Sequence, residues 1–404
     1  MNQLEYNQIL DFGHKSDCPI RTGPSTEIYG NDYSYLRLKN APKLNSYKHK
    51  LTCVELFSGC GGMALGVEEA CREMGVSLEV RFAIDSTQAA VDVFKSNFPD
   101  ANIINGNIQE FFTESLDAPI SREERQLASM VGDVDFLIGG PPCQGLSDLN
   151  NYSRRRDPKN ALYSYMARAA MVLQPKFLII ENVQGIPHDK NRVLQRTAEN
   201  LVRQGYKIDC GLVELPLIGV PQRRRRHLLI ATLSGACPSI NSIISKAAIS
   251  NLRDVRWAIG DLKEPRKLTL SDTPSTPSRD NLNRIDYLFE NDLFDLPNNQ
   301  RPPCHRYKKQ TYNSVYGRLS WDKPSQTITS GFYSMCMGRY VHPNQRRTLT
   351  AREAARLQFF PDFFTFERAG SRTSIATLIG NAVPMKLSYT ITKSLLTHSE
   401  KYAV

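Results

Sequence analysis

The segment Val134-Asp-Phe-Leu-Ile-Gly-Gly-Pro-Pro-Cys-Gln144 indicates both the fold and its most reactive side chain. Its first half is an apolar run typical of a buried strand in a parallel sheet. In such sheets ligands bind at the carboxyl ends of the strands, where this run meets Pro141 and Pro142. The two prolines stiffen the loop and remove two backbone donors. The Cys143 thiol therefore has the fixed position that a nucleophile needs, although most free cysteines are small buried hydrophobes.

Apolar runs and helical periods alternate on both sides of this segment. The expected strands are 51–57, 78–85, 101–108, 134–140, 176–183, 206–215 and 226–233, and helical stretches include 63–74, 88–98, 162–172 and 191–204. This alternation predicts an α/β fold with a doubly wound, Rossmann-like sheet that carries helices on both faces.

The two ends and the segment after Ser234 differ from this pattern. Residues 1–48 are polar and irregular, and they indicate a loosely packed extension. Turns and charged residues dominate 235–312, ordered motifs return in 313–366, and 373–397 suggest a Gly-Asn turn followed by a final helix over 385–397. We predict an extension of 1–48, a main domain of 49–234 with 366–404, and a second, smaller and irregular domain of 235–365.

Composition favours an intracellular protein with an anionic partner. The chain has 404 residues, a net charge of +10, and nine cysteines at irregular spacings. An odd number of scattered cysteines argues against a disulfide framework, and without a Cys-x-x-Cys pair we expect no metal site. The N-terminus resembles no signal peptide, and no run is long enough to span a membrane. Arginine clusters at 154–156, 223–226 and 346–347 favour phosphate contact, although a charge run is more commonly a solvated face.

A glycine loop follows the first expected strand. Phe57-Ser-Gly-Cys-Gly-Gly-Met-Ala64 fits Gly-x-Gly-x-x-Ala, which lets a nucleotide-like ligand approach the backbone at a helix N-terminus. Asp85 ends the next strand and could hold ribose hydroxyls, or cap the helix that follows. NAD and S-adenosylmethionine both fit this arrangement. Glu55 could hold a cationic methionine group, or be a strand residue with a local partner.

A second group of polar residues lies at the ends of later strands. Glu181 ends the apolar strand 176–183, where a carboxylate is costly unless it is paired or functional. The neighbouring strand leads to Cys143, so the thiol and the acid are expected to face one site. Arg224 and Arg226 alternate before another strand and would point the same way.

Taken together, these motifs resemble the DNA (cytosine-5) methyltransferase family over about residues 51–400. The matching segments, in chain order, are Phe57-Ser-Gly-Cys-Gly-Gly62, Gly139-Gly-Pro-Pro-Cys-Gln-Gly145, Glu181-Asn-Val183, Gln222 with Arg224 and Arg226, Arg318–Thr329, Leu349–Gln358 and Gly380-Asn-Ala-Val-Pro384. The order of the motifs makes chance an implausible explanation.

The resemblance implies specific roles. Cys143 would attack C6 of a flipped cytosine, Glu181 would contact its N3 and N4 edge, and Arg226, beside Arg224, would hold O2. The implied S-adenosylmethionine contacts are Phe57, Gly59, Gly61, Gly62, Asp85, Asn107, Ile108, Pro142, Asn381 and Val383. The implied DNA contacts are Gln144, Ser147, Arg154, Arg155 and Arg156, in a mobile loop over 145–160. One departure is Asn107, which stands where the family has an acid that contacts the adenine amine, and it predicts weaker cofactor binding.

The resemblance also implies that 235–365 is the target-recognition domain, in which 235–312 would set sequence choice. It further implies a setting: double-stranded DNA as partner, a cognate restriction endonuclease as a functional companion, a monomer, and the nucleoid of a bacterial cytoplasm. Three other classes remain as alternatives. A tRNA cytosine-5 methyltransferase would carry a Cys-Phe-Thr tripeptide, which this sequence lacks. A DNA-binding protein with an inactive core would not need Cys143, Glu181 and Arg226 together. An NAD-dependent oxidoreductase would leave the Pro-Pro-Cys-Gln segment without a purpose.

Overall fold

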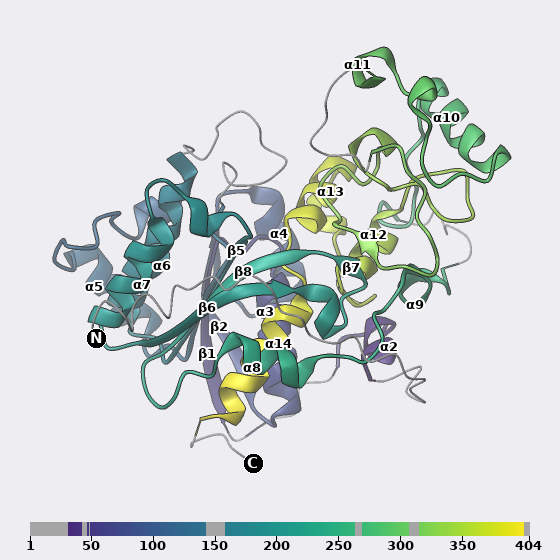
Figure 1. Cartoon of the computed structure of the whole chain (residues 1–404). Coiled ribbons are helices and arrows are strands. Elements are labelled where there is room, and N and C mark those ends of the chain that lie inside the picture. Colours follow the sequence, from purple (N-terminus) through teal and green to yellow (C-terminus); the bar gives the residue numbers. More distant parts are fainter. Residues whose placement is uncertain are drawn as a thin grey trace.

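The computed structural model describes residues 31–42, 47, 49–142, 158–262, 269–306 and 315–399. Its centre is a seven-stranded sheet in the order β3-β2-β1-β4-β5-β8-β6 (Figure 1). The strands are β1 (Lys50–Leu56), β2 (Ser77–Asp85), β3 (Ile103–Asn105), β4 (Phe136–Gly139), β5 (Phe177–Val183), β6 (Lys207–Glu214) and β8 (Arg225–Thr232). A separate two-stranded sheet pairs β7 (Gln222–Arg223) with β9 (Ser325–Gln326).

The first five strands are parallel, and their order reverses between β1 and β4. This is the doubly wound arrangement that the sequence predicts, with the ligand edge at the carboxyl ends of β1 and β4. β8 differs from the parallel expectation, because it runs antiparallel to both β5 and β6. The short connection over 215–224 returns the chain directly along β6, which only an antiparallel pairing allows.

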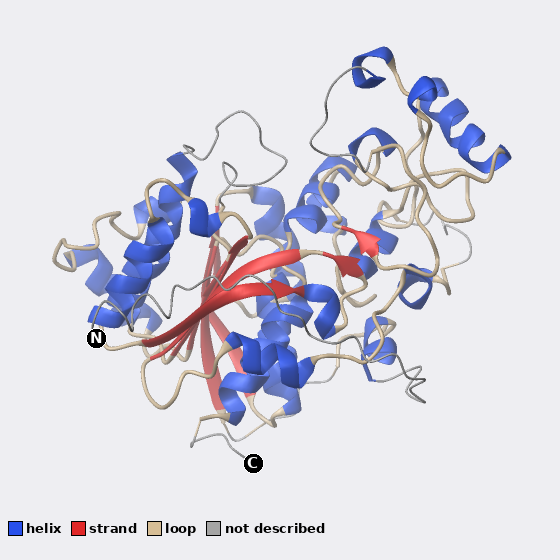
Figure 2. Ribbon diagram, in the orientation of Figure 1, coloured by secondary structure: helices blue, strands red, loops and turns tan. Residues whose placement is uncertain are grey.

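Helices cover both faces of the sheet (Figure 2). The α-helices of the described residues are α2 (Asn31–Leu36), α3 (Gly62–Glu73), α4 (Gln88–Asn97), α5 (Arg122–Val131), α6 (Ser164–Leu173), α7 (Val193–Arg203), α8 (Ile240–Ala247), α9 (Val255–Ile259), α10 (Arg279–Glu290), α11 (Pro303–Arg306), α12 (Ala351–Leu357), α13 (Arg372–Asn381) and α14 (Met385–Thr397). Helices α3, α4, α8 and α14 contribute to one large apolar cluster, and α5, α6 and α7 to another on the opposite face. None of the helices in these described ranges is long and apolar enough to span a bilayer.

All seven expected strands and all five expected helices are present, with ends shifted by a few residues. The predicted Gly-Asn turn in the tail is wrong, since Gly380 and Asn381 are the last two residues of α13. The loosely packed extension is also wrong for its described part. Leu36 on α2 is fully buried, and the Tyr35 ring packs edge-on against Phe363.

Residues 235–365 are distributed over two apolar clusters. Helices α8 and α9 belong to the main cluster, where Ile240 and Val255 are almost wholly buried. Helix α10 belongs to a smaller cluster of its own, built around Ile285, Leu288 and Tyr316. Figure 1 shows α10 and α11 projecting away from the sheet. The domain division stays a prediction. Because α8 and α9 pack in the main cluster, a segment that could be exchanged between relatives would begin after α9.

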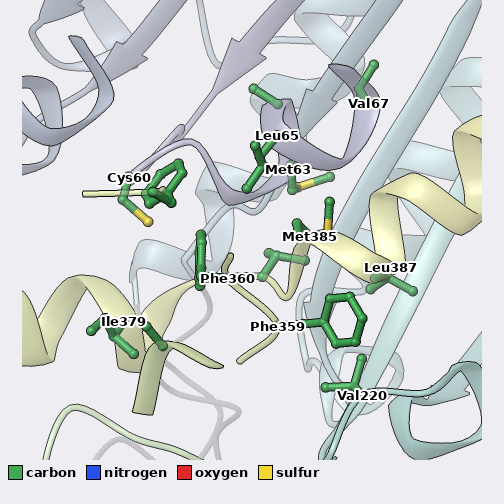
Figure 3. Packing of buried hydrophobic residues seen from close by; sticks show 14 of the residues in the cluster. Cys60, Met63, Leu65, Val67, Val220, Phe359, Phe360, Ile379, Met385 and Leu387 are labelled. Atoms are coloured by element: carbon green, nitrogen blue, oxygen red, sulfur yellow. The ribbon is translucent and has the colours of Figure 1, made fainter. Parts of the chain in front are cut away.

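The main cluster also supports the glycine loop from below. Figure 3 shows Phe360 lying among Cys60, Met385 and other members of this cluster. A Cβ atom at Gly62 would come within 3.1 Å of the Phe360 ring, so a side chain there would collide with the core. The loop after β1 is therefore seated on a rigid apolar base.

Candidate active site

The glycine loop after β1 has the strained backbone of a ligand-binding loop. Phe57, Gly59 and Gly61 all have positive φ, at 55°, 53° and 90°. Left-handed geometry at a bulky residue such as Phe57 costs about 1–3 kcal/mol and is concentrated at functional sites. A Cβ atom at Gly59 would meet nothing within 4 Å, so the described residues leave this part of the loop open.

Asp85 holds this loop through its backbone. One carboxylate oxygen accepts the Gly59 N–H at 2.9 Å, and the other accepts the Thr87 N–H at 2.9 Å. Thr87, rather than Asp85, occupies the N-cap position of α4, so the alternative of Asp85 as the helix cap is wrong. The bond to Gly59 places an acid beside the glycine loop, at the ligand edge of the sheet.

Glu55 is a buried carboxyl group directly behind the loop. It is 1% exposed, and burial raises the pKa of Glu55 well above its usual value, although the Ala64 N–H stabilises the charged form. Its Oε2 atom has no hydrogen-bond partner within the described part of the chain. A buried acceptor without a partner costs free energy, and a cationic or donor group on a ligand would relieve that cost. The loop, Asp85 and Glu55 together fit a nucleoside with a positively charged amino-acid end, as in S-adenosylmethionine.

The base of the cysteine loop is held by a residue that sequence reasoning did not single out. The Asn182 side chain donates to the Pro141 carbonyl at 3.0 Å and accepts the Val183 N–H at 2.8 Å. Both Asn182 and Pro141 are buried. An amide at the end of an apolar strand, next to Glu181, was the signal that could have revealed this contact. Cys143 itself lies outside the described residues, so the structure defines its exit from the sheet up to Pro142.

Glu181 and Arg226 form an ion pair at the same edge. The Arg226 Nε atom lies 2.7 Å from Glu181 Oε1, and both side chains are largely buried. The antiparallel pairing of β5 and β8 explains this proximity, since Val183 lies opposite Arg226 in the sheet. A carboxylate and a guanidinium are thus presented together at the carboxyl end of β5.

Val383 joins the glycine loop to this pair. A Cβ atom at Gly62 would lie 2.6 Å from the Val383 carbonyl, so only glycine permits the approach. A Cβ atom at Gly140 would lie 3.3 Å from Glu181 Oε2 and 3.6 Å from Val383 Cγ2. The predicted cofactor and catalytic groups are therefore contiguous.

Within the described residues, the hydrogen bonds of Arg224 all go to backbone carbonyls, which does not favour its predicted catalytic role. Its guanidinium donates to the carbonyls of Ile328 at 3.2 Å, Gly380 at 3.2 Å and Ala382 at 3.0 Å. The Gln222 side chain also bonds to backbone: it donates to the Leu357 carbonyl and accepts the Ile328 N–H. These contacts favour a positioning role for Arg224.

The other predicted cofactor residues lie near the same edge with varied exposure. Asn107 is exposed and caps the short helix Ile108–Glu110, where Glu110 Oε1 accepts the Asn107 backbone N–H at 3.3 Å. An acid is thus present beside Asn107, three residues later than the family pattern expects. Asn381 is exposed at the end of α13.

The arginine clusters and the other predicted DNA contacts differ in what the structure shows of them. Gln144, Ser147, Arg154, Arg155 and Arg156 lie outside the described residues. Most arginines of the two other clusters already engage carboxylates or carbonyls, which disfavours the expected phosphate contact without testing it. Arg346 pairs with Asp286, Arg347 is bidentate with Glu353, and Arg225 pairs with Glu214.

The sheet order and the site define the class of protein. Parallel strands with an antiparallel β8 inserted next to β6 form the Rossmann-like fold of S-adenosylmethionine-dependent methyltransferases. The chain belongs to the C-5 cytosine-specific DNA methylases, since the model of that family matches residues 51–397. The enzyme is a DNA (cytosine-5)-methyltransferase of the restriction–modification type.

Known relatives agree with this assignment. The chain is 44% identical over 363 residues to the Type II methyltransferase M1.BsuMI of Bacillus subtilis, covering 90% of this chain and 84% of that protein. It is 30% identical to the Type II methyltransferase M1.HphI of Haemophilus parahaemolyticus, covering 87% and 88%. Among solved structures, a putative DNA modification methyltransferase from an Escherichia coli prophage has a TM-score of 0.60 at 24% identity, covering 86% of this chain and 99% of that one.

Proposed function

We propose that the enzyme transfers a methyl group from S-adenosylmethionine to C5 of a flipped cytosine in a specific double-stranded DNA sequence, through a covalent bond between Cys143 and C6. The observation that carries the proposal is the Glu181–Arg226 ion pair at the sheet edge where the chain leaves β4 for Cys143. The target base must leave the helix to reach this edge, so base flipping is part of the proposal.

The chain's own groups account for the steps at the base. The Cys143 thiolate adds to C6, while Glu181 contacts the N3 and N4 edge and protonates or polarises N3, and Arg226 holds O2. Together these contacts draw electron density from C6. C5 then takes the methyl group that bound S-adenosylmethionine would supply; the methyl–sulfur bond would break, and S-adenosylhomocysteine would be the leaving product. Loss of the C5 proton to a base restores the C5–C6 double bond as the Cys143 sulfur departs. Each enzyme group is thereby returned to its starting state.

Bound S-adenosylmethionine supplies the electrophilic methyl group. We propose that Phe57 stacks on the cofactor, that Gly59, Gly61 and Gly62 let it approach the backbone, and that Asp85 contacts its ribose. The positive-φ loop and the unpartnered Glu55 oxygen support this placement. The remaining proposed contacts are Asn107, Ile108, Pro142, Asn381 and Val383.

The partners and setting are also proposals. The Type II names of the relatives support a cognate restriction endonuclease as a functional companion rather than a bound subunit. Double-stranded DNA as substrate, a monomeric enzyme, and action at the nucleoid in a bacterial cytoplasm follow from the same likeness. The five DNA contacts named from the sequence would lie on a loop that closes over the duplex.

The decisive experiment combines a nucleophile variant with covalent trapping. Cys143→Ser should abolish methylation while DNA binding survives, because serine is a far poorer nucleophile at neutral pH. DNA that contains 5-fluorocytosine should form a stable adduct with the wild-type enzyme only, since fluorine cannot leave as a proton does. Wild-type activity in the serine variant would refute the proposal. Labelled S-adenosylmethionine offered with DNA or with tRNA separates this function from the RNA alternative.

A further inference from the structure

Two segments that lie far apart in the sequence are in backbone contact beside the active site. We define the closing segment as residues 380–383 and the recognition segment as residues 327–341. A Cβ atom at Gly380 would lie 2.1 Å from the Ser330 nitrogen and 2.3 Å from the Thr329 carbonyl carbon. Only glycine allows so close an approach, so neither segment can shift alone without opening a gap or a clash.

The Arg224 guanidinium joins these two segments from beneath. It is 2% exposed and donates to Ile328 on one side and to Gly380 and Ala382 on the other. No carboxylate lies within ion-pair distance of it in the described part of the chain. A buried cation held only by carbonyls is costly, and its planar fork demands that all three carbonyls keep their relative positions.

From this junction one set of contacts leads to the cofactor loop. The Val383 carbonyl approaches Gly62, and the Val383 side chain lies beside Gly140, which borders Glu181. A ligand that orders the loop after β1 therefore also favours one position of the closing segment. The packing between the closing segment and the loop after β1 allows little movement, because a side chain at Gly62 or at Gly380 would collide with neighbouring backbone.

The other set leads into the recognition segment. The Tyr340 hydroxyl lies 2.8 Å from Thr329 Oγ1, accepts the Thr329 N–H at 3.2 Å and donates to the Thr327 carbonyl at 3.0 Å. The same stretch is tied to the core by Gln222, which accepts the Ile328 N–H. A movement of residues 327–330 is thus transmitted along the recognition segment to Tyr340.

We infer that Arg224 is a positioning residue that couples cofactor binding to DNA binding, by locking the closing segment and the recognition segment into one arrangement. This inference rests on the proposed function, which requires both ligands. Coupling of this kind is reciprocal: each ligand changes the affinity for the other by the same factor, typically about 5- to 150-fold.

The test measures the dissociation constant of S-adenosylhomocysteine, which has no methyl group to transfer. It is measured with and without saturating duplex DNA that carries the site that the enzyme methylates. The ratio of the two constants is the coupling factor, and wild type should show one of about fivefold or more. Arg224→Met, which keeps much of the side-chain volume but no donor, should lose most of that factor. Arg224→Lys should restore part of it, since an ammonium can still donate to a carbonyl.

Arg225→Met is the matched control, because Arg225 is the next residue along the chain but is exposed and pairs with Glu214. It should keep the wild-type factor. Tyr340→Phe tests the same link without a change in buried charge and should lower the factor even if Arg224→Met fails to fold. A wild-type factor in Tyr340→Phe or in a folded Arg224→Met, or an equal loss in Arg225→Met, would overturn the inference. Wild-type enzyme that binds neither ligand would instead refute the proposed function.

Discussion

At the scale of single residues, the Glu181–Arg226 pair is the group most directly suited to chemistry. Both side chains are largely buried, at an edge where a polar base could replace the solvent. Removal of one partner from a buried pair leaves the other charge uncompensated, so stability and activity must be measured separately for each variant.

Glu181→Gln should slow methyl transfer about 10²- to 10⁴-fold, because glutamine keeps a hydrogen bond but cannot supply a proton. Single-turnover rates with saturating DNA measure the effect on the chemical step. Glu214→Gln is the matched control, since Glu214 also pairs with an arginine but is only half-buried at the end of β6. A Glu181 variant within a few-fold of wild type would assign the pair a structural role.

The arginines of the loop over 145–160 carry a second residue-scale prediction. Replacement of Arg154, Arg155 and Arg156 with alanine should flatten the salt dependence of DNA binding, by about 0.9 in slope for each phosphate that is no longer neutralised. Affinity should fall alike for target and non-target duplexes, because phosphate contacts carry no sequence information. An unchanged slope would show that these side chains face solvent.

At the scale of elements, α2 shows how a segment outside the matched family region is held in place. Asp32 pairs with Lys386 at 2.8 Å and with Arg253 at 2.8 Å. Arg37 donates to the Trp257 carbonyl and pairs with Asp261. These contacts hold α2 against α9, α14 and the chain after α12. Helix α2 therefore packs on the first part of residues 235–365.

The anchoring of α2 should depend on pH. Burial by itself raises the pKa of Asp32, but Lys386 and Arg253 outweigh this effect and hold it below the usual value. A carboxyl group with a lowered pKa in the folded state contributes stability above its unfolded pKa of about 3.9, and that stability is lost as pH falls through the folded pKa.

Asp32→Asn should therefore destabilise the enzyme at pH 7 by about 1.5–3 kcal/mol, because two cations lose a charged acceptor. The difference from wild type should shrink as the pH falls below about 4. Melting temperatures over a pH series measure both effects, with Asp100→Asn as a control on an exposed acid. A pH-independent difference would argue that the hydrogen-bond geometry, rather than the charge of Asp32, holds α2.

At the scale of the whole molecule, the described residues form two large apolar clusters, one on each face of the sheet, and a small cluster around α10. Exchange of all of 235–312 would remove α8 and α9 from the main core. Exchange of 276–341 keeps both helices and replaces the whole small cluster, but it also replaces Leu319, Ile328, Phe332 and Tyr340 of the main cluster.

Grafting 276–341 from the Haemophilus relative should redirect methylation to that relative's site, because sequence choice is predicted to reside outside the sheet. Sequencing of cytosine methylation in a host without its own cytosine methylation gives the result. A chimera that folds but methylates the original site would place recognition elsewhere, and a graft of 235–312 should fold less well than the shorter one.

The sequence by itself determined the elements and the edge of the sheet at which the chemistry lies. Apolar runs define strands locally, and Phe57, Asp85, Pro141 and Glu181 each follow or end such a run. Because carboxyl ends of parallel strands meet at one edge, these residues had to converge wherever the strands were placed.

Only the tertiary structure decided which of those residues touch. Arg226 meets Glu181 because β8 is antiparallel, a direction that the apolar pattern of β8 does not encode. Arg224 donates to carbonyls 104 and 156 positions away. Because every residue has a backbone carbonyl, the sequence does not show which ones Arg224 contacts. The docking of α2 also depends on partners such as Arg253 and Lys386, which only long-range packing brings to Asp32. Local periodicity reports burial, whereas side-chain partners are set by the packing of distant segments.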